Sequence, residues 1–414
     1  MKEKQILTAE SVTEGHPDKL CDLIADSVLD ECLRNDPNSR VACEVMATSG
    51  KVIVAGEITT AKMPDIPYIA CRTIRHVGYS CDYEIEIITH DQSPDIAGAV
   101  DSCSKSCDTG GLYIDSLDGR LVDNCSGNAD DGSLGAGDQG IMYGYACSET
   151  DMLLPLPVVL AHRITRLLTA ARRNGPIKGL RPDGKAQVSV EYRNGIPRRI
   201  AAVVVSCQHA ENKPLEELRK EITEHIVLPV CSEMLIDSKT QILINPSGRF
   251  VLGGFEADTG LTGRKLMVDT YGGLVPHGGG ALSGKDATKV DRSGTYMARY
   301  VAKNIVAAGI AERCTVSLAY AIGRVEPVAV DVDTHETGEF QDDVIAEAVK
   351  SVFDLTPSGI IRTLGLHKPI FAATANYGHF SCPDYPWERT NRTEELKVLC
   401  TVIEEEHFYA ERRR

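Results

Sequence analysis

The sequence has no excess of positive charge, no long apolar run and no CxxC pair of cysteines, the closest two being Cys103 and Cys107. Its 44 lysines and arginines stand against 59 aspartates and glutamates, which gives a formal net charge of −15. A nucleic-acid-binding protein or a basic membrane-surface protein needs a positive field, overall or on one face, so the charge argues against both classes. A small polyanionic substrate, held by a local cluster of cations, remains compatible with this composition.

The apolar stretches are too short to span a membrane. Residues 152–161 form the most apolar segment, which contains two prolines and falls short of a bilayer's thickness. The charged first residues lead into no apolar run, so we expect no signal peptide. The 14 cysteines are dispersed without a CxxC pair. This disfavours metal knuckles and favours reduced thiols in a cytoplasmic protein over a disulfide framework.

Periodicity and turn signals predict the same order three times: a helix, a hairpin and a second helix. The first round comprises a helix at 17–34, strands at 41–48 and 51–58, a helix at 66–77 and a strand at 84–89. The second comprises a helix at 155–173, a hairpin at 186–208 around Asn194-Gly195, a helix at 214–234 and a strand at 241–244. The third comprises a helix at 293–308, strands at 314–322 and 328–333, and a helix at 341–353.

This recurrence, at a spacing of about 130–140 residues, predicts an α+β fold of three similar lobes, each of sheet plus helices. We place the N-terminal lobe at 1–114, the central lobe at 115–245 and the C-terminal lobe at 246–414. Coincidence is the alternative, because the helix–hairpin–helix order is common.

Residues 135–140, Gly-Ala-Gly-Asp-Gln-Gly, match the GxGxxG pattern of dinucleotide-binding folds. That fingerprint follows a strand and opens a helix, whereas here an acidic, glycine-rich loop precedes it, so the context disfavours NAD binding. We interpret the segment as a loop that carries Asp138 and Gln139, with a plain turn before a strand as the simpler alternative.

A second glycine-rich run, at 279–285, ends in Lys285 and matches the GxxxxGK of a phosphate-binding loop, although Asp286 stands where that motif needs Ser or Thr. Lys289 and Asp291 follow just before an expected helix, and cations at a helix N-terminus favour an anion site. Five cations stand among glycines within about forty residues: Arg249, Arg264, Lys265, Lys285 and Lys289.

Two further pairs of residues carry charge in a suggestive place. A two-residue turn at Ser49-Gly50 places Glu44 and Glu57 on one sheet face as diagonal neighbours, among apolar residues that suggest a cation or an ammonium group nearby. His16 and Asp18 begin the first helix, and by themselves they are most simply a cap and a first-turn carboxylate favoured by the helix dipole.

Taken together, these motifs resemble the methionine adenosyltransferases (S-adenosylmethionine synthetases). The resemblance spans about residues 10–387 and rests on six blocks: Glu-Gly-His-Pro-Asp-Lys at 14–19, Gln-Ser-Pro-Asp-Ile at 92–96, residues 135–142, Gly-Leu-Thr-Gly-Arg-Lys at 260–265, residues 278–293 and Tyr-Gly-His-Phe at 377–380. It implies that ATP, L-methionine and water give S-adenosylmethionine, phosphate and diphosphate, by attack of the methionine sulfur on C5′ of ATP and hydrolysis of the tripolyphosphate.

The resemblance also implies a pseudo-threefold arrangement of the three lobes and two kinds of metal ion. These are Mg²⁺, with two ions expected in each site, and K⁺, with one ion in each subunit. It implies a homodimer with active sites at the interface, and favours assembly of two dimers into a homotetramer in the cytoplasm. Partners other than ATP and L-methionine, in particular nucleic acid or a membrane, are not expected.

Residue by residue, the resemblance assigns most of the site. It implies ATP contacts at His16, Asp183, Lys185, Arg249, Phe250, Asp258, Arg264, Lys265, Ala281 and Lys285, with Phe250 placed to stack on adenine. It implies methionine contacts at Glu57, Gln92, Asp138, Asp258 and Lys289, Mg²⁺ ligands at Asp18 and Asp291, and a K⁺ ligand at Glu44. The catalytic set is His16, Lys185, Arg264, Lys285, Lys289 and Asp291, and a mobile loop is expected from Gln92 through residue 101.

One block departs from the family's pattern. Residues 253–258 read Gly-Gly-Phe-Glu-Ala-Asp where the family usually has Gly-Gly-Pro-x-Gly-Asp. We expect the loop to have rearranged so that Ala257 takes a negative φ. Two other functions use the same anion site: another ATP-dependent transferase, such as a phosphotransferase that releases ADP, and a non-catalytic adenine-nucleotide sensor. The paired glutamates and the Gln92 loop argue against the sensor, which needs neither a methionine pocket nor a lid.

Overall fold

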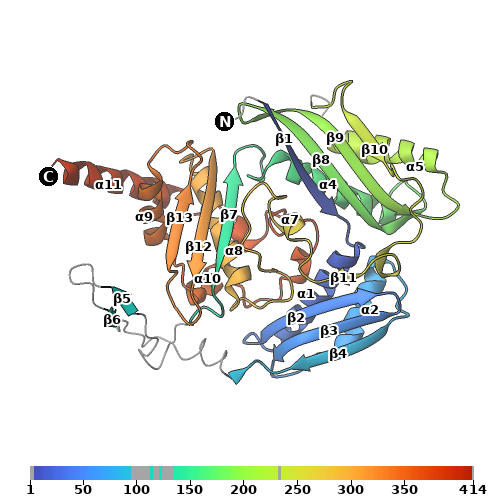
Figure 1. Ribbon diagram of the computed structural model, residues 1–414, viewed down its shortest axis with the longest axis horizontal. Coiled ribbons are helices and arrows are strands. Elements are labelled where there is room, and N and C mark those ends of the chain that lie inside the picture. Colours follow the sequence, from blue (N-terminus) through green and yellow to red (C-terminus); the bar gives the residue numbers. More distant parts are fainter. Residues whose placement is uncertain (1–3, 95–111, 115–120, 124–133, 232–234, 413–414) are drawn as a thin grey trace.

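A computed structural model of the chain describes residues 4–94, 112–114, 121–123, 134–231 and 235–412. The expected mobile loop therefore lies, beyond residue 94, outside the described residues. Three β-sheets surround the centre of the molecule, and helices pack on one face of each (Figure 1).

The first sheet has the order β11-β2-β3-β4, formed by Gly260–Leu261, Arg40–Thr48, Lys51–Thr59 and Glu84–His90. β3 and β4 run parallel, and the other pairs are antiparallel. Helices α1 (Pro17–Asn35) and α2 (Ile66–Val77) pack together beside it. Pro17 occupies the first turn of α1, where its missing N–H is harmless, and the His16 Nδ1 caps the helix by accepting from the Asp18 N–H at 3.3 Å.

The second sheet has the order β1-β8-β9-β10, formed by Lys4–Val12, Leu180–Arg193, Ile196–His209 and Gln241–Ile244. Helix α4 (Leu156–Asn174) packs against it, and α5 (Leu215–Ile222) continues into a π-helical turn at Thr223–Val227 and a short α6 (Leu228–Val230). The β8–β9 turn has positive φ at Asn194 (+50°) and Gly195 (+78°), as a tight hairpin turn requires. The helix expected at 214–234 ends at Val230 and contains a π-helical turn just before Pro229, which has no N–H to bond back to the preceding turn; residues 232–234 lie outside the described residues.

The third sheet has the order β13-β12-β7, formed by Ala329–Asp333, Arg313–Tyr320 and Gly140–Cys147. Helix α8 (Val290–Ala307) packs on β7 and β12, and α9 (Asp342–Val352) packs on β13. The remaining elements are β5 and β6 (Leu112–Ile114 and Leu121–Asp123), α7 (Leu266–Asp269), α10 (Pro357–Leu364), α11 (Thr393–Glu411) and short 3₁₀ turns at Gly254–Glu256, Ala372–Thr374 and Pro386–Glu388. Helix α8 begins at Val290 and not at 293, so Asp291 lies in its first turn.

Each of the three sheets contains one strand from a different predicted lobe. β1, from the predicted N-terminal lobe, pairs with β8 from Lys4↔Arg193 to Val12↔Lys185. β7 lies within the predicted central lobe but pairs with β12, and β11, from the predicted C-terminal lobe, pairs with β2. The exchange is cyclic, so no lobe completes its sheet from one contiguous segment. The lobe boundaries themselves remain a prediction.

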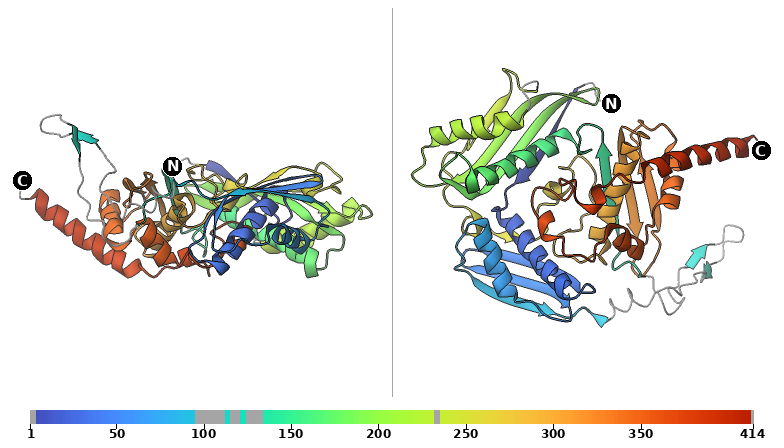
Figure 2. Two further views of the ribbon diagram at one scale, coloured as in Figure 1. Left: turned by 90° about the horizontal axis from the view of Figure 1, so that it is seen from below. Right: turned by 180° about the vertical axis from the view of Figure 1, so that it is seen from behind.

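The sheets leave one face uncovered by helices. Figure 2 shows the molecule edge-on as a flat layer, and from behind it shows the helices in front of the sheets. On β2 the residues alternate, with Val45 buried and Met46 44% exposed. Large apolar side chains are exposed on strands of all three sheets: Ile6, Met46, Ile88, Ile141, Ile196 and Leu243.

The cysteines depart from the sequence-based expectation at one pair. Cys71, on α2, and Cys81 form a disulfide, so the expectation of reduced thiols throughout is wrong here. The free cysteines among the described residues are buried, apart from Cys382, which is partly exposed. No helix in the described ranges is both long and apolar enough to cross a membrane.

Candidate active site

The N-terminus of α1 brings His16 and Asp18 against the loop at 260–265. One Asp18 carboxylate oxygen accepts from the Leu261 N–H at 3.0 Å, and the other accepts from the Lys265 Nζ at 2.5 Å. The Arg264 Nε lies 3.8 Å from the same carboxylate. Burial opposes ionisation of Asp18, but the Lys265 contact and charge, together with the Leu261 N–H, outweigh it and lower the pKa of this carboxyl. Asp18 is therefore ionised and paired with cations.

His16 is neutral in this setting. Burial, followed by the positive charge of Lys265, lowers the pKa of His16 to about 3. Because Nδ1 accepts from the Asp18 N–H, Nε2 carries the ring proton. The side chain is thus a neutral N–H donor at the entrance of α1.

Asp183 and Lys185, on β8, lie beside the segment that leads into His16. The Thr13 N–H donates to the Gly184 carbonyl at 2.9 Å, and Val12 pairs with Lys185. Asp183 accepts from the Gly254 N–H at 2.9 Å, and burial raises the pKa of Asp183 to about 6. Asp258, on the same loop as Gly254, is exposed, and its negative charge adds to that shift.

The second glycine-rich run supplies two lysines, and each is paired with a carboxylate. The Lys285 Nζ lies 2.6 Å from Asp291 Oδ2, and the Lys289 Nζ lies 2.5 Å from Asp286 Oδ2. Lys285 and Asp291 are both partly exposed, at 23% of each side chain. These charges are accessible and already ordered.

Lys285 extends the first sheet toward the paired glutamates. Lys285 forms an isolated bridge with Ala42, which in turn pairs with Glu57. The Glu57 Oε1 lies 3.2 Å from the His90 Nε2. Glu44 pairs with Ala55, as the two-residue turn predicts, so Glu44 and Glu57 share the uncovered face. The Gln92 N–H donates to the Thr59 hydroxyl at 3.1 Å, at the end of the same strand as Glu57.

A glycine brings the loop at 260–265 into contact with the glycine-rich run at 278–289; these two segments are called the cationic loops below. A Cβ at Gly263, whose φ is +78°, would lie 2.6 Å from the Ala281 Cβ. A Cβ at Gly280 would lie 2.1 Å from an Asp291 oxygen. The approach of the two loops thus depends on glycine at 263, while glycine at 280 lets the second run lie against Asp291. The approach unites two sets of predicted site residues: His16, Asp18, Arg264 and Lys265 with Ala281, Lys285 and Asp291.

Other predicted residues lie at the margins of this group. Asp138 is exposed two residues before β7, and its side chain accepts from the Gln139 N–H at 2.7 Å. The glycine motif that carries it leads into a strand, as the simpler interpretation expects. Arg249 pairs with Glu211 at the surface, at 2.6 Å, and Phe250 exchanges hydrogen bonds with His209.

Gln208, which belongs to none of the sequence motifs, connects the Phe250 segment to Asp183. Its Nε2 donates to the Val251 carbonyl at 3.0 Å, and its Oε1 accepts from the Asp183 N–H at 3.2 Å. A buried row of aspartates on α1 was likewise not recognised, although their spacing of four residues is visible in the sequence.

The block at 253–258, which departs from the family's pattern, has an unstrained backbone at Ala257. Ala257 has φ −98°, as expected, whereas Gly254 takes the positive φ (+64°). Phe255 is buried and packs edge-on against Tyr83, with ring centroids 5.7 Å apart.

Metal binding can be judged from the donors present. Within the described ranges, no cluster of three or more His, Cys, Asp or Glu side chains could hold a metal ion. Mg²⁺ in nucleotide sites, however, commonly takes one or two carboxylates together with substrate phosphates. Asp18 and Asp291 are single carboxylates beside the cationic loops, so their chemistry fits Mg²⁺ held jointly with a triphosphate. Glu44 offers a single exposed carboxylate, an oxygen donor of the kind that suits K⁺.

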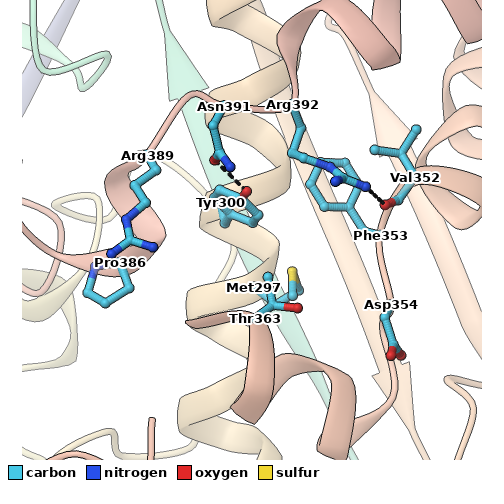
Figure 3. Close-up of a pocket in the computed structure, with 10 residues that line it drawn as sticks. All are labelled: Met297, Tyr300, Val352, Phe353, Asp354, Thr363, Pro386, Arg389, Asn391 and Arg392. Carbon is cyan, nitrogen blue, oxygen red and sulfur yellow. Dashed lines mark hydrogen bonds between the residues drawn. The ribbon is translucent and has the colours of Figure 1, made fainter. Parts of the chain in front are cut away.

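Two hollows differ in their relation to this group. An open hollow of about 490 Å³ lies beside residues 263–268 and is lined by Arg264 and Lys265. Another, of about 590 Å³, lies in the C-terminal part of the chain and is lined by Tyr300, Arg389 and Arg392, among others (Figure 3). No predicted site residue lines the second hollow.

The three-lobed α+β fold, with cationic loops beside the start of α1, fits an ATP-binding transferase. The comparisons identify which one: the N-terminal, central and C-terminal domains of S-adenosylmethionine synthetase match residues 4–104, 133–250 and 252–389. The chain therefore belongs to the S-adenosylmethionine synthetase family and forms S-adenosylmethionine from ATP and methionine. The motif resemblance and the three-lobed α+β fold are confirmed. The family is ATP- and metal-dependent in general.

Proposed function

We propose that the two cationic loops, at 260–265 and 278–289, bind the triphosphate of ATP and stabilise tripolyphosphate as it leaves C5′. The observation that carries this proposal is the contact between the loops at Gly263 and Ala281, which gathers lysines and an arginine beside His16. The methionine sulfur attacks with a free lone pair and loses no proton, so the reaction needs no general base. The difficult part is the charge that develops on the leaving group, and fixed cations stabilise that charge.

The proposed catalytic residues act on that charge. Lys285 and Lys289, with Arg264 and Lys185, contact the phosphates, and the neutral His16 donates its Nε2–H toward the leaving oxygen. Each lysine of the loops has a carboxylate partner, which holds the ammonium group in place before ATP arrives. The same cations retain tripolyphosphate for hydrolysis to phosphate and diphosphate.

We assign the remaining contacts as follows. Lys265 and Ala281 complete the triphosphate site, while Asp183, Arg249 and Phe250 bind the adenosine, with Phe250 stacking on adenine. Asp258 touches both substrates. Methionine is held by Glu57, Gln92, Asp138 and Lys289; the tie between Gln208, Val251 and Asp183 supports the adenosine assignment.

We assign Asp18 and Asp291 to Mg²⁺, two ions in each site, and Glu44 to K⁺. Bound Mg²⁺ supplies neutralisation of the charge on the triphosphate. Asp18 and Asp291 are supported by their position beside Lys265 and Lys285, where a triphosphate would join them.

The uncovered sheet face supports a homodimer, with a second copy as its occupant. Exposed Ile6, Met46, Ile88 and Ile141 lie on strands of three sheets, and such a broad apolar face is typical of an interface. Glu44 and Glu57 share the face with Met46, so a partner seated there would border the site. We propose that two dimers form a homotetramer in the cytoplasm, where disulfides are rare, since the free cysteines among the described residues outnumber the one disulfide pair.

Product analysis tests this function. After incubation with ATP, methionine, Mg²⁺ and K⁺, we expect S-adenosylmethionine, phosphate and diphosphate in equal amounts. Free tripolyphosphate accumulating beside S-adenosylmethionine would contradict the proposed hydrolysis, and ADP as the product would contradict the adenosyl transfer.

A further inference from the structure

Helix α1 carries an unusual row of buried carboxylates. Asp18, Asp22, Asp26 and Asp30 follow one another at intervals of four residues and therefore share one face of the helix. All are at most 3% exposed. Burying an aspartate is costly unless the carboxylate is hydrogen-bonded and paired, so each position must have a specific partner.

The partners are backbone amides of loops far away in the sequence. The Asp22 Oδ1 accepts from the Gly263 N–H at 2.9 Å, and the Asp26 Oδ1 accepts from the Gly284 N–H at 2.7 Å. Asp30 accepts from the Phe371 and Ala372 N–H groups at 2.9 and 3.0 Å. Asp22 and Asp26 therefore hold the two cationic loops, whereas Asp30 holds a segment outside them.

Asp26 and Arg292 together clamp the backbone at Lys285. Arg292, fully buried, binds Asp26 through two contacts of 2.6 and 2.9 Å and also donates to the Lys285 carbonyl at 3.2 Å. The peptide units on both sides of this turn are thus fixed by one ion pair. Gly284 has φ +81°, and a Cβ there would lie 1.9 Å from the Cys43 carbonyl oxygen, so the turn has little freedom to adopt another shape.

Asp22 anchors the other loop in the same way. Its Oδ2 accepts from the buried Lys19 Nζ at 2.9 Å, and Lys19 also binds Asp269, just beyond the 260–265 loop. Gly263 immediately precedes Arg264 and Lys265, so fixing its amide fixes the point from which both side chains start.

We propose that Asp22 and Asp26 are positioning residues, which hold the two cationic loops at the separation that the triphosphate requires. This inference rests on the proposed function of those loops. Asp30, on the same helix face, bonds no amide of either loop. The segment that it holds reaches them only through Arg292, which Phe371 and Thr374 contact, so Asp30 is the control at one remove. Asp22 and Asp26 act through backbone amides and touch no substrate.

The test compares Asp22→Asn, Asp26→Asn and Asp30→Asn. Each change keeps the side-chain shape and replaces one acceptor oxygen by an amide, so each loses part of a buried hydrogen-bond set. For each variant we would measure kcat, the KM for ATP and for methionine, thermal unfolding, and binding of inorganic tripolyphosphate by calorimetry.

We expect Asp22→Asn and Asp26→Asn to weaken tripolyphosphate binding and to lower kcat/KM for ATP at least tenfold, with a smaller change in the KM for methionine. Asp30→Asn should lower the unfolding temperature comparably, yet keep tripolyphosphate binding and kcat/KM within twofold. A merely structural role would instead leave binding by the folded protein unchanged in all three variants, and that result would overturn the inference. If Asp26→Asn does not fold, the comparison of Asp22→Asn with Asp30→Asn decides.

Lys285→Met separates this inference from the function on which it rests. If Lys285→Met loses activity while Asp22→Asn and Asp26→Asn behave like the wild type, only the positioning role is wrong. If Lys285→Met keeps full activity and tripolyphosphate binding, the proposed phosphate site itself is wrong.

Discussion

Replacing Lys285 by methionine should lower kcat/KM strongly while leaving the fold intact. The Lys285 Nζ pairs with Asp291 at 2.6 Å, and both side chains are partly exposed. An ion pair of this kind contributes at most about 1 kcal/mol to stability. The stability of the variant should therefore change little, since methionine keeps most of the apolar stem.

The catalytic loss should be much larger. A charge-assisted contact to a leaving group in a site that excludes water is worth about 2–4 kcal/mol. This corresponds to a fall in kcat/KM of roughly 30- to 900-fold. Steady-state rates of S-adenosylmethionine formation, measured beside thermal unfolding, give both quantities. Lys289→Met should show a similar loss, because Lys289 belongs to the same cationic loop and is likewise paired with an aspartate, Asp286.

Lys213→Met provides the matched control. Lys213 is also paired with carboxylates, Glu217 at 2.5 Å and Glu221 at 2.7 Å. It comes two residues before α5, a helix that lies far from β11 and the cationic loops (Figure 1). Lys213→Met should lose at least as much ion pairing as Lys285→Met, because Lys213 has two carboxylate partners, without loss of turnover. Equal rates in Lys285→Met and Lys213→Met would refute the reasoning.

Three further predictions follow from the site and its surroundings. Excess EDTA should abolish turnover, and Glu44→Ala should remove stimulation by K⁺ but not the need for Mg²⁺; a variant still stimulated by K⁺ would contradict the Glu44 assignment. Ala257→Gly should lower the free energy of unfolding by about 0.4–1 kcal/mol, because Ala257 has a negative φ, and should change the KM for methionine more than that for ATP; a gain in stability would speak against it. Burial lowers the pKa of His16 from 6.5 in the unfolded chain to about 3 in the folded protein. The contribution of the neutral ring to the free energy of unfolding is therefore complete above pH 6.5 and is lost as the pH falls toward 3. His16→Gln should therefore lose less stability across that range in urea titrations than the wild type, and an unchanged slope would contradict the buried neutral ring.

Local patterns predicted the individual elements well. The helix at 66–77 and the strand at 241–244 have the expected bounds, and the register of the first hairpin, Thr48↔Lys51 and Glu44↔Ala55, follows from its two-residue turn. These features depend on residues close together in the sequence, where periodicity and turn chemistry act directly.

The pairing of strands far apart in the sequence could not be predicted from local sequence patterns. Nothing in residues 4–12 indicates that β1 joins β8, about 180 residues later, because a strand's partner is not encoded in its own alternation. The Cys71–Cys81 disulfide was missed for a similar reason, since it depends on how the chain after α2 returns.

The candidate site shows the same division. The cationic loops stood out because five cations among glycines are conspicuous in an acidic chain. Their anchors did not, because Asp22 and Asp26 on a helix resemble a solvated face until the loops that cover them are known. The fold must be present before a buried charge can be told from an exposed one.

A crystal structure with a non-hydrolysable ATP analogue, Mg²⁺ and methionine tests the central claim most directly. The account predicts that the triphosphate lies between the 260–265 loop and the 278–289 run, with the Lys285 and Lys289 Nζ atoms within hydrogen-bonding distance of its oxygens. A triphosphate bound elsewhere, for example in the hollow beside Arg389 and Arg392, with both lysines still paired only to Asp291 and Asp286, would contradict it.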